Sequence, residues 1–228
     1  MSERIRRITE RNRLGRHIEH DERSKGFAIA RLATAPKSVS FERHCAPYDQ
    51  GELGSCTGNA MAGVLMSDPF WKDGRLLTES DAVRLYSEAT HLDNIQGSYP
   101  PQDTGSSGLG VAKAAKKEGW IKGYEHAFGL DDLIHGLSQR PGLLGIYWYT
   151  SFDTPLPSGE CRLTPNASVR GGHEVQMFRL DARQKRVWCY QSWGDSWGGL
   201  HNGTFWFSFK TLERLLDQHG DATFPVVG

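Results

Sequence analysis

The sequence predicts an α+β protein in which helices come first and strands follow. Up to residue 137, apolar residues recur at helical spacing; after Pro141 the chain turns into runs rich in aromatic and β-branched residues. Segregation of helices and strands along one chain is typical of α+β proteins. We therefore expect a helical lobe at about 48–139 and a β-rich lobe at about 140–228, with an active site in the cleft between them.

The helical lobe is predicted to contain four helices, and Thr78, followed by Glu79 and Asp81, marks the N-terminus of the second. They cover about 57–65, 78–91, 107–118 and 130–137. Strands are expected at 142–150, 173–181, 186–193 and 203–209, followed by a last helix at 211–218.

Residues 1–40 are charged and weakly periodic, and are expected to form an extended or partly ordered segment ahead of a single domain at 41–228. Their basic residues suit a solvated terminus better than a nucleic-acid arm. A third hypothesis is that this segment covers the cleft. The basic residues among the first 25 are Arg4, Arg6, Arg7, Arg11, Arg13, Arg16, Arg23 and Lys25.

The charge balance argues against nucleic-acid and membrane partners, because 27 basic residues meet 27 acidic ones. The basic start is not followed by the apolar core of a signal peptide. Four irregularly spaced cysteines fit neither a disulfide framework nor a zinc site. His44 beside Cys45 is too small a set for a metal. We expect a cytoplasmic monomer without metal or organic cofactor.

Cys56 is the candidate nucleophile because it stands where a glycine-rich turn becomes a helix. The positive end of the helix dipole favours the thiolate. His173, behind two glycines at the head of a strand, is the candidate base. Asp181, Gln191 and Asp195 are the groups available to orient it, and Trp193 would shield a bond to Gln191 from water.

These residues resemble the active-site segments of the papain-like cysteine peptidases in their compact, propeptide-free form. "YDQGELGSC" resembles the family's nucleophile segment, in which a glutamine six positions ahead supplies an oxyanion donor; here this is Gln50. "GGHEVQMF" resembles the histidine strand, and "QSWG" at residues 191–194 resembles its Asn-Ser-Trp-Gly motif. The resemblance covers about 48–209.

The resemblance implies roles for eight residues. Cys56, His173, Gln191 and Gln50 would be catalytic, and Gly105, Ser106, Gly172 and Trp193 would border the bound peptide. Gly105 and Ser106 would line the subsite for the residue next but one to the scissile bond.

Four positions depart from the family pattern. Gln191 replaces asparagine, Glu174 replaces the alanine after the histidine, Thr57 replaces tryptophan, and Leu53 replaces a cysteine of the common disulfide. The longer side chain of Gln191 is less pre-organised.

The expected function is therefore cleavage of peptide or protein substrates by a Cys–His pair through an acyl-thioester. Two alternatives stay open. One is a binding or scaffold protein on the same fold with a decayed site. The other is a transamidase or peptidoglycan amide hydrolase that uses the same Cys–His pair.

Overall fold

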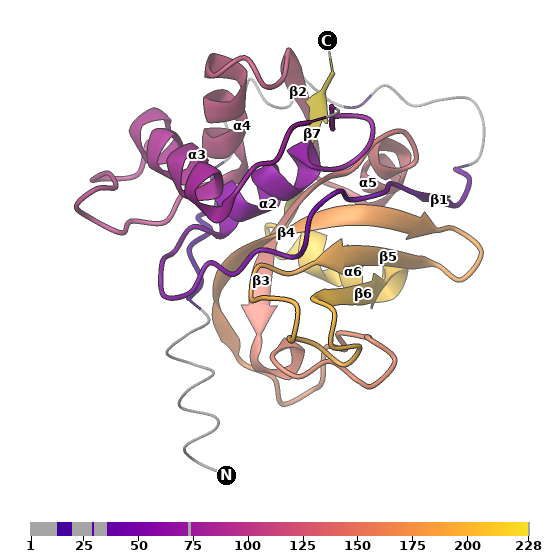
Figure 1. Cartoon of the computed structure of the whole chain (residues 1–228). Helices are drawn as coiled ribbons and strands as arrows, with labels where there is room; N and C mark the ends of the chain where they lie inside the picture. The colour runs from indigo at the N-terminus through magenta and orange to yellow at the C-terminus, as the bar shows by residue number, and fades with distance from the viewer. Residues whose placement is uncertain (1–12, 20–28, 30–35, 73, 228) are drawn as a thin grey trace.

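The computed structural model describes residues 13–19, 29, 36–72 and 74–227 and shows a twisted sheet with the helices of residues 56–117 gathered at one end (Figure 1). The strands hydrogen-bond in the order β2-β7-β3-β4-β5-β6, and β1 pairs with β4. All of these pairings are antiparallel. The strands are β1 (Val39–Ser40), β2 (Gly123–Ala127), β3 (Gly142–Tyr149), β4 (Val169–Asp181), β5 (Arg186–Tyr190), β6 (Thr204–Ser208) and β7 (Asp221–Val226).

The helices divide between two apolar cores. In the described residues, α2 (Cys56–Leu65), α3 (Glu79–Leu92) and α4 (Gly108–Lys117) pack on one another, and their apolar faces form one core. The second core lies on the sheet, under α5 (Leu130–Leu137) and α6 (Phe209–Asp217). A 3₁₀ turn, η2 (Thr150–Phe152), follows β3.

Helix α2 is buried along its whole length, which its small residues permit. A Cβ atom at Gly58 would overlap the carbonyl oxygen of Ala82 in α3 and lie 2.9 Å from the Tyr86 side chain. On its other side α2 contacts β4. The helix that begins at Cys56 is thus held between the helical core and the sheet.

The expected helices are all present, with ends within two residues of the predicted ones. The second has the predicted capping box, in which Thr78 and Asp81 satisfy each other's backbone groups. Strands β1, β2 and β7 were not predicted. Moreover, Ala127 of β2 and Leu133 of α5 belong to the core of the sheet, although both precede residue 139. These two residues of the expected helical lobe therefore pack on the sheet.

No helix in the part of the chain that the structure describes is long and apolar enough to cross a membrane.

Candidate active site

Cys56 is the first residue of α2 and is completely buried. Backbone hydrogen bonds from Glu174, Gly15 and Thr57 reach its thiol and lower its pKa, but removal from water outweighs them. Burial and the neighbouring Glu174 carboxyl raise the pKa of Cys56 to about 12. The thiolate expected from the helix dipole is therefore not favoured in this arrangement, because Gly15 and Glu174 cover the sulfur.

His173 lies in β4 and is held by a hydrogen bond of 2.6 Å between its Nε2 atom and Oε1 of Gln191. That oxygen also accepts a bond of 2.8 Å from the backbone N–H of Ser192, which identifies it as the amide oxygen. An amide oxygen can only accept hydrogen bonds. The Nε2 atom of the imidazole must therefore be the donor in its bond to Gln191, so Nε2 carries the proton.

This tautomer leaves the Nδ1 atom of His173 with a free lone pair. Nδ1 is buried and has no hydrogen-bond partner in the described part of the chain. Burial lowers the pKa of His173 to about 4, against the opposing effect of the Gln191 hydrogen bond. The ring is thus neutral at pH 7, with an unoccupied basic nitrogen.

Aromatic rings enclose the His173–Gln191 pair. Trp193 stacks on the imidazole with ring centroids 5.0 Å apart, and Trp148 meets it edge-on at 5.2 Å. Trp197 packs on both tryptophans. Because this cage excludes water, it strengthens the hydrogen bond that orients the imidazole.

Gln50 is buried beside α2, and its amide is fully used. Its Oε1 atom accepts from the hydroxyl of Ser192 at 2.6 Å. Its Nε2 atom donates to the carbonyl oxygens of Leu53, at 2.8 Å, and Arg13, at 2.9 Å. The donor expected to serve an oxyanion therefore holds a carbonyl oxygen of the N-terminal segment.

Residues 13–19 lie along the candidate site as an irregular segment, with an isolated β-bridge between Arg16 and Ser106. The N–H of Arg16 donates to the carbonyl of Gly172 at 3.0 Å. Ser106 donates to the carbonyl of Gly15 at 2.8 Å and accepts from the N–H of His17 at 2.7 Å. A cavity of about 260 Å³ borders this segment. Three residues expected at the substrate cleft, Gly105, Ser106 and Gly172, thus contact residues 15–17.

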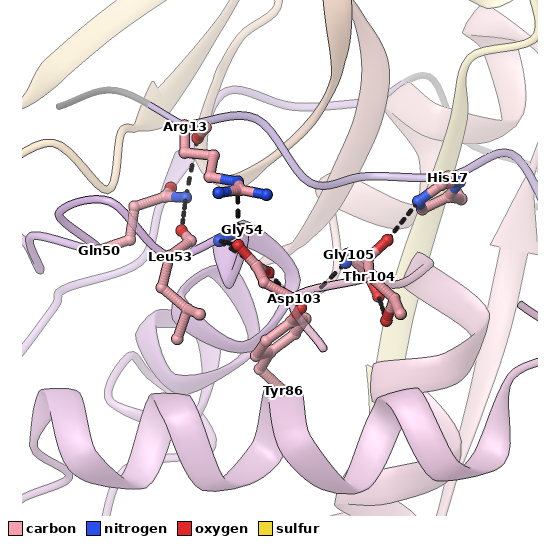
Figure 2. A network of polar contacts seen from close by, with 9 residues as sticks. All are labelled: Arg13, His17, Gln50, Leu53, Gly54, Tyr86, Asp103, Thr104 and Gly105. Atoms are coloured by element: carbon pink, nitrogen blue, oxygen red, sulfur yellow. Dashed lines mark hydrogen bonds and ion pairs between the residues drawn. The ribbon is translucent and has the colours of Figure 1, made fainter. Parts of the chain in front are cut away.

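Figure 2 shows a second set of contacts, centred on Asp103, that holds this segment. The Asp103 carboxylate pairs with Nε of Arg13 at 2.9 Å and accepts from the backbone of Gly54 at 3.0 Å. It also accepts from the hydroxyl of Tyr86 at 2.6 Å, and that hydroxyl in turn accepts from the N–H of Gly105 at 2.9 Å. The N-terminal segment is therefore tied to the loop that precedes α4.

Arg16 departs from the expectation of a solvated basic terminus. It is only 5% exposed, and its guanidinium donates to Asp221 of β7 and, at 3.1 Å, to the carbonyl of His219. Glu174 lies 4.0 Å from its Nε. Arg13, by contrast, is exposed as expected. The other basic residues of the first 25, Arg4, Arg6, Arg7, Arg11, Arg23 and Lys25, lie outside the described residues.

The structure brings His173 and Gln191 into contact and stacks Trp193 on them. Sequence reasoning missed Arg16 and Asp221, which are 205 positions apart and carry no local motif. A usable signal was Glu174, an acidic residue inside an apolar strand, which required a partner. Within the described residues, no group of three or more His, Cys, Asp or Glu side chains is placed to hold a metal.

Solved structures of cysteine proteases superpose on this chain. Xylellain, a cysteine protease from Xylella fastidiosa, superposes with a TM-score of 0.71 and 17% sequence identity over 96% of this chain and 98% of that one. A digestive procathepsin L2 proteinase from Tenebrio molitor gives 0.62 and 14% identity over 97% and 80%. The bromelain protease from Ananas comosus, in complex with the E64 inhibitor, gives 0.58 and 14% over 85% and 100%.

The chain therefore has the papain-like α+β fold. No protein-family model and no curated protein matches the sequence.

Proposed function

We propose that this chain, with the fold of the papain-like cysteine proteases, is a cysteine peptidase that cleaves peptide bonds through a thioester on Cys56. The observation that carries the proposal is the tautomer of His173. Gln191 accepts from Nε2–H, so the buried Nδ1 atom is left as a base with no other partner among the described residues. Most buried side-chain polar atoms have a hydrogen-bond partner, so an unpartnered ring nitrogen at this position favours a chemical role for His173.

In the proposed reaction, Nδ1 of His173 has already taken the thiol proton when the thiolate of Cys56 attacks the peptide carbonyl carbon. The tetrahedral oxyanion accepts hydrogen bonds from the backbone N–H of Cys56 and the Nε2 of Gln50. The imidazolium then gives its proton to the leaving amine as the C–N bond breaks. In the second half, water attacks the thioester, passes a proton to Nδ1, and the C–S bond breaks.

The candidate site is closed by residues 13–17, and a substrate must displace them. The carbonyl of Arg13 takes the hydrogen bond of Gln50, and Gly15 covers the thiol. Displacement readmits water to Cys56, which removes the main cause of its raised pKa. We therefore expect the thiolate–imidazolium pair to form only in the open site.

The test uses the full chain and a variant in which the segment no longer fits. A Cβ atom at Gly15 would overlap the carbonyl oxygen of Gly54, so Gly15→Val expels the segment without altering Cys56, His173 or Gln191. In this variant, we expect rapid alkylation of Cys56 by iodoacetamide below pH 7 and hydrolysis of a fluorogenic peptide library. In the parent chain, both are expected to be slow. Peptide mass spectrometry separates Cys56 from the other three thiols.

Arg16→Glu is an independent second variant, because its carboxylate would be repelled by Asp221 and Glu174. Cys56→Ala in either background is the control and should abolish hydrolysis. If both open variants alkylate only as pH rises past about 8.5, like an ordinary thiol, and cleave no peptide, the peptidase proposal is wrong and a scaffold role replaces it. Preferential transfer of the trapped acyl group to added amines over water would instead indicate a transamidase.

A further inference from the structure

The side chain of Arg16 fills a buried pocket next to the strand that carries His173. Two acidic residues form its walls: Glu174, which follows His173 in β4, and Asp221, the first residue of β7. The Arg16 side chain is 1% exposed, and its guanidinium pairs with Asp221. Arg16 is thus buried against the residue that follows His173 in the sequence. The backbone of that residue, Glu174, also contacts the thiol of Cys56.

Glycines give the pocket its room. A Cβ atom at Gly145 of β3 would lie 2.6 Å from Nε of Arg16 and 2.9 Å from oxygens of both Asp221 and Glu174. At Gly108, the first residue of α4, a Cβ atom would lie 3.0 Å from Glu174. Any larger residue at Gly145 would take the space that the guanidinium fills.

The fit of Arg16 in this pocket is incomplete. Both carboxyl oxygens of Glu174 are buried without a hydrogen-bond partner in the described part of the chain, as are Nε and Nη1 of Arg16. Burial and the charge of Asp221 raise the pKa of Glu174. A buried carboxyl group without hydrogen bonds is costly to a fold unless another ligand uses it.

We propose that the Glu174–Asp221 pocket selects a basic side chain, arginine before lysine, in the peptide that this enzyme cleaves, and that Arg16 fills the pocket in place of the substrate. This inference rests on the proposed peptidase function and adds the substrate class. Arg16 is paired in the backbone with Ser106, which the resemblance places at the subsite for the residue next but one to the scissile bond. The basic residue is therefore expected at that position of the substrate.

Arginine is favoured over lysine because the pocket presents acceptors at separate points. Asp221, the carbonyl of His219 and the free oxygens of Glu174 surround a planar group with several N–H donors. A guanidinium can bond to such acceptors at once, whereas the ammonium of lysine is a compact, strongly hydrated charge. Apolar side chains would leave the carboxyl groups buried and unpaired.

The first experiment measures kcat/KM of the full-length Gly15→Val chain on matched peptides that carry Arg, Lys, Leu or Phe at that position. We expect arginine to exceed leucine by roughly 10- to 100-fold, the worth of a hydrogen-bonded charge in a buried site. Asp221→Asn in the same background should remove most of this preference. Asp131→Asn, at an exposed position of α5, is the matched control and should keep it. Equal cleavage of the four peptides, or a preference that survives Asp221→Asn, overturns the proposal.

The second experiment does not depend on catalysis. In Arg16→Ala the pocket is empty, and ethylguanidinium should raise the melting temperature of the full chain more than ethylammonium does. The double variant Arg16→Ala, Asp221→Asn should lose this difference. If no peptide is cleaved but guanidinium rescue occurs, the peptidase function fails and the basic-side-chain pocket stands. If cleavage occurs without arginine preference, only the pocket proposal fails; if neither cleavage nor rescue is seen, both are wrong.

Discussion

The chemistry of His173 depends on a single amide oxygen. Oε1 of Gln191 accepts from both the imidazole and the N–H of Ser192, so the side chain is fixed at two points although it is one methylene longer than asparagine. The second bond compensates for the added freedom of the longer chain. In the proposed mechanism, Gln191 is thus a positioning residue that sets which nitrogen of His173 is basic.

Replacing Gln191 by alanine should therefore impair catalysis, because His173 would no longer be held in its Nε2–H tautomer. In the Gly15→Val background, we expect kcat to fall on the order of 100-fold, within the range of general acid–base effects. Nitrogen NMR of His173 should change from an Nε2–H form to a tautomer mixture, which a loss of packing alone would not produce.

Gln176→Ala is the matched control, because Gln176 is an equally buried amide of β4 that bonds to Ser67 and Arg43 instead. It should leave the His173 tautomer unchanged. A Gln191→Ala chain with an intact Nε2–H form would contradict the positioning role.

Local motifs are enough to single out Cys56, His173 and Gln191 as candidates from the sequence, because each lies in a short stretch with its own pattern. The pairing of Arg16 with Asp221 has no such pattern, since it joins the first and last parts of the chain. Nor does sequence reveal how deeply Cys56 is covered. The dipole of α2 is a local property, whereas burial of the thiol depends on Gly15 and Glu174 from distant segments.

At the scale of elements, helix α2 positions Cys56, the proposed nucleophile, through close approach to α3. Gly58 is the point of contact: α2 can lie this close only because Gly58 has no side chain between it and the backbone of Ala82. Gly58→Ala should destabilise the fold by about 1–3 kcal/mol, as overpacking of a core does. The measurement is chemical denaturation of the full chain.

Gly123→Ala in β2 is the matched control, because a Cβ atom there would meet nothing within 4 Å. It should leave the unfolding midpoint nearly unchanged. A Gly58→Ala chain as stable as the parent would show that α2 is free to shift, and would remove the argument that α3 fixes Cys56.

The long helices and the central strands follow from periodicity, but β2 and β7 do not. Strand β2 carries Glu125 and His126, and β7 contains Pro225, so neither has the composition of a typical strand. Strand β2 is defined mainly by pairing with β7, and β7 by pairing with both β2 and β3. Tertiary pairing of this kind cannot be deduced from local preference, which is why the first residue of β7, Asp221, escaped notice.

At the scale of the whole molecule, the N-terminal segment joins the two cores across the candidate site. Arg13 pairs with Asp103 ahead of α4, while Arg16 pairs with Asp221 in the sheet. Its backbone bonds both to Ser106 and to Gly172. The order of motifs along the chain predicts the papain-like fold, whereas the closed state of the site arises from these contacts between distant segments.

The global stability should depend on pH through the buried ring of His173. In the folded chain its pKa is lowered to about 4 from an ordinary 6.5, so between these values the unfolded chain binds more protons. The free energy of unfolding therefore falls as pH decreases from 6.5 to 4, by about 3 kcal/mol in total. Glu174 acts in the opposite direction, because its raised pKa lets the folded chain keep a proton that the unfolded chain has lost.

The two effects are separated by comparing the parent with His173→Gln in urea titrations at several pH values. The difference in unfolding free energy between the two chains should shrink or reverse steadily as pH falls through this window. A constant difference would mean that His173 is accessible to water and protons in the folded chain, and the enclosed, neutral base on which the mechanism depends would have to be abandoned.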